Sequence, residues 1–298
     1  MRFVMVSFLL GAVLGSATAE VLVVAPDGSG DYPTIQAAVD AASDGDEVVL
    51  LDGVFLGCGN RDIYFEEKTI VIRSASGDPT SCVIDCQGSA DEWHWAIWFA
   101  MTDEETTLSE ITVTGGYLPY GAGIRVGPEG SCTIRGCIFW GNTAEEDGAA
   151  IYTAVPGMVL IESCTVVGNT APGGAIGADD WGHADIRNTI VAYTHGGPAV
   201  DCWTGNVTVS CSNFFENEGG DWDNSCVGDF LGVGGNISED PLFCGWEEGN
   251  YYLQSDSPCA PGGECGLIGA LPVGCEPSPV MESTWGGVKA LYRHPATE

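Results

Sequence analysis

The amino-acid sequence predicts an all-β chain that folds as a right-handed parallel β-helix, a solenoid of coils with three short strands each. Three observations support this prediction. Similar segments recur every 23 to 27 residues, aliphatic residues recur at fixed positions within each repeat, and frequent Gly, Asn and Pro leave no room for long helices. The composition agrees, because 43 glycines and only 17% charged residues are typical of short buried strands joined by tight turns.

The first 19 residues predict an export signal. Met1 and Arg2 form a short charged start, an apolar stretch runs through residues 3–15, and Ala17-Thr18-Ala19 is a small-residue cleavage site. No later apolar run reaches the roughly 20 residues that cross a bilayer. We therefore expect a secreted or cell-surface protein whose mature chain begins near Glu20 and has no transmembrane segment.

Thirteen cysteines in an exported chain predict several disulfides, and the odd number leaves at least one thiol outside an intrachain pair. The closest spacings join Cys82 to Cys86 and Cys132 to Cys137, and no matching His pair follows either of them. Structural bridges are therefore favoured over a zinc site at these positions.

A short amphipathic helix is predicted near the mature N-terminus. Ile35, Ala38, Val39 and Ala42 form an apolar face at helical spacing, and Pro33 is tolerated in a first helical turn. Such a helix would cap the first coil, because an open solenoid end exposes strand edges and core.

The repeat is clearest in the middle of the chain, where CIFWGNTA starts at Cys137 and CTVVGNTA starts 27 residues later at Cys164. Two further strand positions share this phase in successive repeats; they hold Ile124, Ile151, Ile176 and Val200, and Ile134, Ile161, Ile186 and Val209. Coils stacked about 4.8 Å apart would align each position with its copy, and the chain length predicts roughly ten coils.

Asn142 and Asn169 follow an apolar strand at equivalent points of two repeats. Asn tolerates left-handed turn geometry, and its side-chain amide can pair with its copy in the next coil. Cys137 and Cys164 are likewise expected to stack as small buried apolar residues.

We expect one β-helix domain over residues 20–275, including the N-terminal cap and a C-terminal closing module. Residues 276–298 are predicted to be a Pro-rich linker followed by a short amphipathic tail, which could dock on the open end of the stack or retain the protein at a surface.

Several segments resemble a known superfamily. VLVVAPDGSGDYPTIQAAVDAASDGDEVVLLDGVF resembles the opening of pectin-methylesterase-like and pectate-lyase-like β-helix proteins, and the GNTA and GGAI segments resemble bacterial right-handed β-helix repeat proteins. GNISEDPLFCGWEEGNYYLQSDSPCAPGGECGLIGAL is similar to their closing module. The resemblance implies the fold, but the catalytic motifs of pectin methylesterases and polygalacturonases are missing.

The charge balance restricts the partners. The chain has 42 Asp and Glu against 9 Lys and Arg, a formal net charge of −33. Such a chain repels phosphate backbones, so no nucleic acid is expected as a partner. It also repels polyuronates unless a divalent cation such as Ca²⁺ bridges the carboxylates of both molecules.

The densest polar segment is GADDWGHADIR, residues 177–187. Asp179, Asp180 and Asp185 are the candidate ligands of a calcium ion. His183 and Arg187 are the candidate bases that would remove a proton beside a uronate carboxyl, as the resemblance to pectate lyases implies. A solvated polar corner without a site is the competing interpretation.

Three aromatic residues are candidates for binding sugar rings: Tyr152, Trp181 and Trp203. Arg135, Glu162 and Arg187 share one strand position in three successive repeats and should point outward as a ladder of alternating charge, which is foremost structural.

Two functions remain open at this point. One is a secreted β-helix that engages an extracellular polysaccharide, with a calcium-dependent lyase as its enzymatic form. The other is a non-catalytic adhesin or structural spacer, because solenoids host both kinds of function. We expect the protein to be a monomer.

Overall fold

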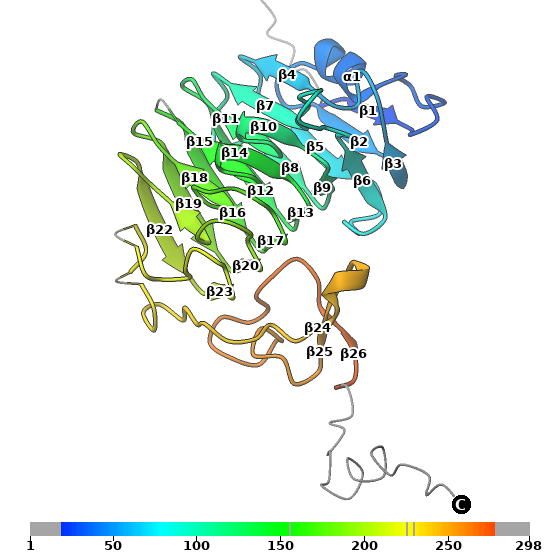
Figure 1. Cartoon of the computed structure of the whole chain (residues 1–298). Helices are drawn as coiled ribbons and strands as arrows, with labels where there is room; N and C mark the ends of the chain where they lie inside the picture. Colours follow the sequence, from blue (N-terminus) through cyan, green and yellow to red (C-terminus); the bar gives the residue numbers. More distant parts are fainter. Residues whose placement is uncertain (1–18, 155, 225, 229, 278–298) are drawn as a thin grey trace, which may run out of the picture.

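The computed structural model describes residues 19–277 except residues 155, 225 and 229, so the expected signal peptide and C-terminal tail lie almost wholly outside it. Three parallel sheets run along one stack of coils, as Figure 1 shows. This arrangement confirms the predicted right-handed parallel β-helix.

The strands of the three sheets are as follows. Sheet 1 consists of β1 (Val21–Val24), β2 (Glu47–Leu50), β5 (Val71–Ser74), β8 (Thr107–Ser109), β12 (Ser131–Arg135), β16 (Met158–Glu162), β19 (His183–Arg187) and β22 (Asn206–Ser210). Sheet 2 consists of β3 (Gly53–Phe55), β6 (Cys82–Asp85), β9 (Thr112–Thr114), β13 (Ile138–Trp140), β17 (Thr165–Val167), β20 (Ile190–Ala192) and β23 (Asn213–Phe215). Sheet 3 consists of β4 (Ile63–Glu66), β7 (Ile97–Ala100), β11 (Ile124–Val126), β15 (Ile151–Thr153), β18 (Ile176–Ala178) and β21 (Val200–Asp201). A separate pair joins β10 (Tyr117–Tyr120) to β14 (Thr143–Asp147).

The register of the strands is the one that the repeat predicts. Ile124 pairs with Ile151, and Ile151 pairs with Ile176, so equivalent residues of successive coils stack. The stack is shorter than predicted, because it has about seven turns rather than roughly ten. The chain beyond β23 makes an end cap and a separate small sheet instead of further coils.

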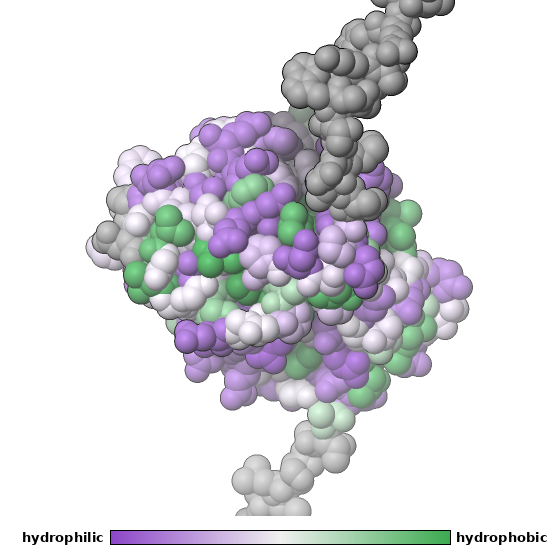
Figure 2. All heavy atoms as spheres, turned by 90° about the horizontal axis from the view of Figure 1, so that it is seen from below, coloured by the Kyte–Doolittle hydropathy of each residue, from purple (hydrophilic) through white to green (hydrophobic). Residues whose placement is uncertain are grey.

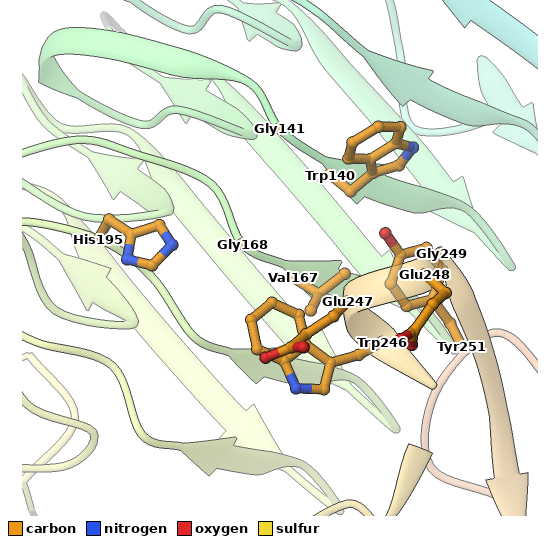
Figure 3. Close-up of a pocket in the computed structure, with 10 residues that line it drawn as sticks. All are labelled: Trp140, Gly141, Val167, Gly168, His195, Trp246, Glu247, Glu248, Gly249 and Tyr251. Carbon is orange, nitrogen blue, oxygen red and sulfur yellow. The ribbon is translucent and has the colours of Figure 1, made fainter. Parts of the chain in front are cut away.

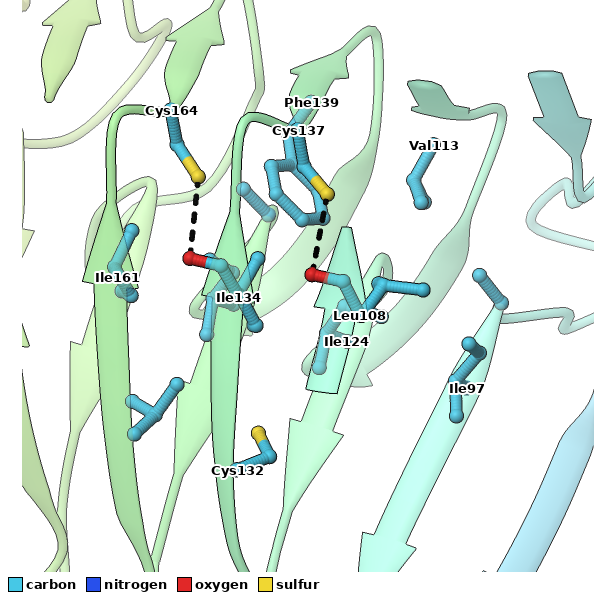
Figure 4. Packing of buried hydrophobic residues seen from close by; sticks show 14 of the residues in the cluster. Ile97, Leu108, Val113, Ile124, Cys132, Ile134, Cys137, Phe139, Ile161 and Cys164 are labelled. Carbon is cyan, nitrogen blue, oxygen red and sulfur yellow. Dashed lines mark hydrogen bonds between the residues drawn. The ribbon is translucent and has the colours of Figure 1, made fainter. Parts of the chain in front are cut away.

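The core runs along the axis of the stack. Its inward-facing residues are fully buried in each sheet; among them are Leu108, Ile134, Ile161, Ile186, Val113, Phe139, Val166, Val191, Ile97, Ile124, Ile151 and Ile176. Figure 4 shows Cys137 and Cys164 at equivalent corners of this core, where each thiol donates to a carbonyl of the preceding coil, at 3.7 and 3.5 Å. Burial raises the pKa of Cys137 to about 12, so its thiol stays protonated and behaves as a small apolar group.

The predicted asparagine ladder is present. The backbone N–H and the side-chain amide of Asn142 both donate to Asn169 Oδ1 at 3.1 Å, and Asn169 Nδ2 donates to the carbonyl of Phe139 at 2.9 Å. The left-handed conformation was expected at the asparagines, but the glycine before each of them adopts it instead. The φ angle is +62° at Gly141 and +58° at Gly168. Glycine adopts this conformation without a steric cost, which leaves Asn free to bond along the stack.

The N-terminal cap is also confirmed. Helix α1 (Ile35–Ala41) begins after Thr34, whose side chain accepts a hydrogen bond from the N–H of Ala37, so Pro33 lies just before the helix rather than in its first turn. Ile35, Ala38, Val39 and Ala42 are buried against the first coils.

A loop closes the other end of the stack. The ring of Trp222 stacks on Phe214 with 4.3 Å between ring centroids, and Val227 is fully buried beside them. The disulfide between Cys202 and Cys226 joins this loop to the last strand of sheet 3. The C-terminal end of the core is thus covered by residues within the domain.

The closing module packs on the side of the stack, not on its end (Figure 1). It consists of β24 (Phe243–Gly245), the 3₁₀ turn η1 (Trp246–Glu248), β25 (Asn250–Gln254) and β26 (Val273–Cys275). Its apolar residues pack against the outward side chains of sheet 2, among them Ile138 and Ile190. The disulfide Cys211–Cys265 joins the module to the stack, and Cys244–Cys275 links β24 to β26 within it.

The bridges that the closest cysteine spacings favoured are not formed. Cys82, Cys86, Cys132 and Cys137 are buried free thiols. Each points into the apolar core, where a free cysteine packs as a small apolar side chain and needs no disulfide. The three disulfides that do form all lie in the C-terminal part of the described chain, between Cys202 and Cys275.

Within the described residues, no helix is long and apolar enough to cross a membrane. Figure 2 shows one face of the molecule as mostly hydrophilic, with small hydrophobic patches between the polar side chains.

Candidate functional site

The structure divides the polar segment 177–187 between two faces of the stack. Asp179 and Asp180 lie in the turn between β18 and β19, on the side of sheet 3. Asp185 and Arg187 lie on β19 in sheet 1, where the Arg187 guanidinium donates to the Asp185 carboxylate. The other Asp185 oxygen accepts from the Thr208 hydroxyl at 3.0 Å. Asp185 is therefore engaged within sheet 1, away from Asp179.

The two candidate bases, His183 and Arg187, lie on the outer face of sheet 1. They line a hollow of about 260 Å³ together with Asp185, Glu104 and Met158. This hollow does not include Asp179 or Asp180, so the proton-abstracting groups and the corner carboxylates are not brought together.

The charge ladder expected on sheet 1 has the predicted register. Arg135 pairs with Glu162, and Glu162 pairs with Arg187, in successive strands. Arg135 Nε lies 2.7 Å from Glu162 Oε2, whereas Arg187 bonds to Asp185 of its own strand. Exposed pairs of this kind contribute at most about 1 kcal/mol each, so the ladder is a structural feature.

A larger cleft lies beside the C-terminal end of sheet 3, and we call it the acidic cleft. Its volume is about 580 Å³. Its lining residues come from β10, β14, β21 and adjoining turns: Tyr120, Glu146, Asp147, Pro172, Gly173, Asp179, Asp201, Cys202 and Trp203.

The floor of the acidic cleft lies along one column of sheet 3, that is, along equivalent positions in successive strands. Tyr152, Gly177 and Asp201 occupy the same position in three successive strands. Gly177 leaves a gap in this column, and the carboxylate of Asp147 fills it, since a β-carbon at Gly177 would lie 2.4 Å from Asp147 Oδ2. A β-carbon at Gly173 would also lie 2.7 Å from Asp147. The two glycines therefore make room for a carboxyl group.

Asp147 is the most perturbed carboxyl group of this cleft. Its side chain is only 5% exposed, Oδ1 accepts from the N–H of Gly148 at 2.6 Å, and the buried Oδ2 has no hydrogen-bond partner. Burial, followed by the charges of Asp179 and Asp201, raises its pKa to about 8. Asp147 is thus protonated at neutral pH, next to two other carboxyl groups.

Asp179 forms hydrogen bonds with two aromatic residues at the cleft. Its Oδ1 accepts from the N–H of Trp203 at 2.8 Å, and the Tyr152 hydroxyl lies 3.4 Å from its Oδ2. The rings of Tyr120 and Tyr152 lie 5.2 Å apart. Burial and the nearby carboxylates raise the pKa of Tyr152, so both tyrosines remain neutral donors.

Of the three aromatic candidates, only Trp203 lines this cleft. Trp203 lies at its rim with 86% of its surface exposed, and Tyr152 is buried beneath it with its hydroxyl at Asp179. Trp181 is 80% exposed on the neighbouring corner but does not line the cleft.

The expected calcium ligands do not fit that ion. Calcium takes six to eight oxygen ligands, but Asp185 lies on another face of the stack, so the three expected carboxylates are not brought together. In the part of the chain that the structure describes, no group of three His, Cys, Asp or Glu residues is arranged to hold a metal ion.

A second cleft, of about 460 Å³, lies where the closing module meets sheet 2. Figure 3 shows Trp140 and Trp246 on opposite sides of this tryptophan cleft, with Val167 between them and His195 at one end. Trp246 stacks on Tyr193 with 4.3 Å between centroids, which attaches the module to the stack. His195 bonds to Glu218 at 3.2 Å. We interpret these contacts first as the packing of the module.

Sequence reasoning missed Asp147, Asp201 and Tyr120. Asp147 lies in the plain acidic run TAEED, and its burial depends on Gly173 and Gly177 in the next coil. The sequence signal for this site was Gly177. It occupies the strand position that holds Tyr152 in the preceding coil and Asp201 in the following coil.

Comparisons with known proteins add a fold likeness. No family model and no curated protein matches this sequence. Among solved structures, pectate lyase Pel9A is similar, with a TM-score of 0.45 and 11% identity over 87% of this chain and 97% of that chain. The assignment of the fold depends on the strand pairings described above, and the site has to be argued from its own residues.

Proposed function

We propose that this chain binds an extracellular polysaccharide in the acidic cleft. The observation that supports this most is the combination of aromatic rings and carboxylates around one opening, with Trp203 exposed at the rim and Tyr120 and Asp179 on the wall. Sugar rings stack their apolar faces on aromatic planes and donate their hydroxyl groups to carboxylates. The volume of about 580 Å³ lies within the range of small-molecule sites.

Binding without cleavage fits this geometry better than a lyase reaction does. A lyase needs a base within hydrogen-bond reach of the proton that it removes. The candidate bases His183 and Arg187 line a different face from Asp179. The protein would then act as a polysaccharide-binding adhesin or spacer, and this combines both functions that the sequence left open.

An extracellular location agrees with this proposal. The three disulfides require an oxidising compartment to form and persist.

A glycan array with wild-type protein and two tryptophan variants tests the proposal. Trp203→Ala should weaken binding at least tenfold, because it removes the platform at the rim. Trp181→Ala is the matched control, since Trp181 is similarly exposed but lies outside the cleft, and it should bind like wild type. Equal losses in the two variants, or no glycan bound by wild type, would contradict the proposal.

An ultraviolet assay for unsaturated uronide products, with calcium present or chelated, separates binding from lyase activity. We expect no absorbance increase on polyuronates. A calcium-dependent increase that disappears in the Asp179→Ala, Asp180→Ala double variant would replace the binding proposal with a lyase.

A further inference from the structure

The acidic cleft has an uncompensated negative charge. Among the described residues that line it, none is Lys, Arg or His. The neighbouring cation, Arg125, pairs with Tyr152 in the column of sheet 3, but its guanidinium lies 4.6 Å above the ring of Trp98, one coil further away. Hence no side chain of the cleft wall neutralises its carboxylates.

One of these carboxyl groups lacks a partner although it is buried. Asp147 is about 95% buried, since only 5% of its surface is exposed, and its Oδ2 has no hydrogen bond. More than nine in ten buried polar groups of folded proteins are paired, because an unpaired one costs free energy. The glycines at 173 and 177 make room for this group rather than exclude it. Since Asp147 is protonated, the carboxylates that lack a cation are those of Glu146, Asp179 and Asp201, which line the same cleft.

The walls also determine what kind of cation fits. The ring of Tyr120 lines the cleft and lies 5.2 Å from the ring of the buried Tyr152, and the indole of Trp203 is exposed at the rim. Aromatic faces attract ammonium groups through the ring quadrupole, most strongly where carboxylates are close by. A bare metal ion would make no use of these rings, whereas an ammonium group on a sugar would use both the rings and the carboxylates.

We infer that the acidic cleft selects a cationic polysaccharide, a chain of amino sugars with free ammonium groups, over neutral or uronic acid chains. This inference rests on the proposed function, because it names the substrate class of the same cleft. The ammonium group of one sugar residue would lie between Asp179 and Asp201, with its ring against Trp203. A uronate in the same position would face the carboxylates of Asp179 and Asp201.

Isothermal titration of the full mature chain with three oligosaccharides of equal length tests this inference. The first is β-1,4-linked glucosamine, the second is its N-acetylated counterpart, and the third is galacturonate, all at a mildly acidic pH that keeps the amines protonated. The first two differ only in the acetyl group that removes the charge. We expect the glucosamine oligomer to bind at least tenfold more tightly than the acetylated one, a difference of about 1.4 kcal/mol. Galacturonate should show no measurable binding.

The outcomes separate the inference from the proposed function. Equal affinity for the charged and acetylated oligomers, or tighter binding of galacturonate, would overturn the inference while polysaccharide binding stands. Failure of all three oligomers, together with an empty glycan array, would overturn both.

Variants that remove single charges test whether the preference for the charged oligomer arises in the acidic cleft. Asp201→Asn keeps the shape of the side chain and removes one charge, so it should reduce the affinity for the glucosamine oligomer about tenfold and that for the acetylated oligomer much less. Asp185→Asn on sheet 1 removes the same charge outside the cleft and should change neither. A parallel loss for both oligomers in Asp201→Asn would indicate that this residue only supports the fold, and would contradict the assigned charge recognition.

Discussion

Replacing Asp147 with Asn should remove a large part of the pH dependence of stability. Burial raises the pKa of Asp147 from its usual 3.8 to about 8. At pH values between these two pKa values, Asp147 is protonated in the folded protein and ionised in the unfolded chain. Lowering the pH therefore favours the native state. This contribution is complete below about pH 4 and is lost as the pH rises to about pH 8.

The magnitude follows from the shift. Each pH unit within this window costs the wild-type protein about 1.4 kcal/mol relative to a variant that carries no ionisable group at this position. From about pH 5 to about pH 8, the unfolding free energy of the wild type should therefore fall by about 4 kcal/mol more than that of Asp147→Asn. The other carboxyl groups titrate in both proteins, so the difference isolates Asp147.

Urea unfolding of both proteins at several pH values measures this difference, and Asp185→Asn serves as the control because Asp185 is bonded to Arg187 and partly exposed. The control should follow the wild type at every pH. Parallel stability profiles for wild type and Asp147→Asn would refute the argument that Asp147 is buried and protonated.

Three further predictions concern the stack itself. Phe139→Ala, at a fully buried core position, should lower the unfolding free energy by about 3–5 kcal/mol, measured by urea titration, and a loss below about 1 kcal/mol would contradict the packing described here. Asn169→Ala removes buried hydrogen bonds of the ladder and should cost about 1–3 kcal/mol in the same assay, whereas an unchanged midpoint would show that the ladder is dispensable. Cys202→Ser with Cys226→Ser opens a link across 24 residues and should lower stability by about 2–4 kcal/mol, with faster proteolysis of the loop around Trp222; unchanged proteolysis would contradict its role as the end cap.

The sequence was sufficient for the fold because a parallel stack repeats itself. The 27-residue interval between Cys137 and Cys164 is one turn of the coil, so reading the interval also predicts that Ile124 pairs with Ile151. The face of α1 was predictable for a similar reason, since its apolar spacing is local.

The ends and the pairings across modules were not predictable in this way. Cys211 and Cys265 are 54 residues apart and meet only because the closing module folds back along sheet 2. No local pattern encodes that path. The number of coils was overestimated for the same reason, since residues that cap the end have the composition of further coils.

The site was predicted in part. Trp203 and Asp179 line one cleft and Tyr152 is buried beneath it with its hydroxyl at Asp179, while Asp185, His183 and Arg187 belong to another face. Residues that are close in sequence separate at a corner of the coil, because the strands before and after the corner belong to different sheets. Asp147 could be recognised only from the glycines of the next coil, which requires the register in three dimensions.

The crystal structure of the mature chain with a bound glucosamine oligomer tests the central claim most directly. We predict a sugar against Trp203 with its ammonium nitrogen within about 4 Å of the carboxylate of Asp179 or Asp201. An oligomer bound instead between Trp140 and Trp246 in the tryptophan cleft, with the acidic cleft empty, would contradict it.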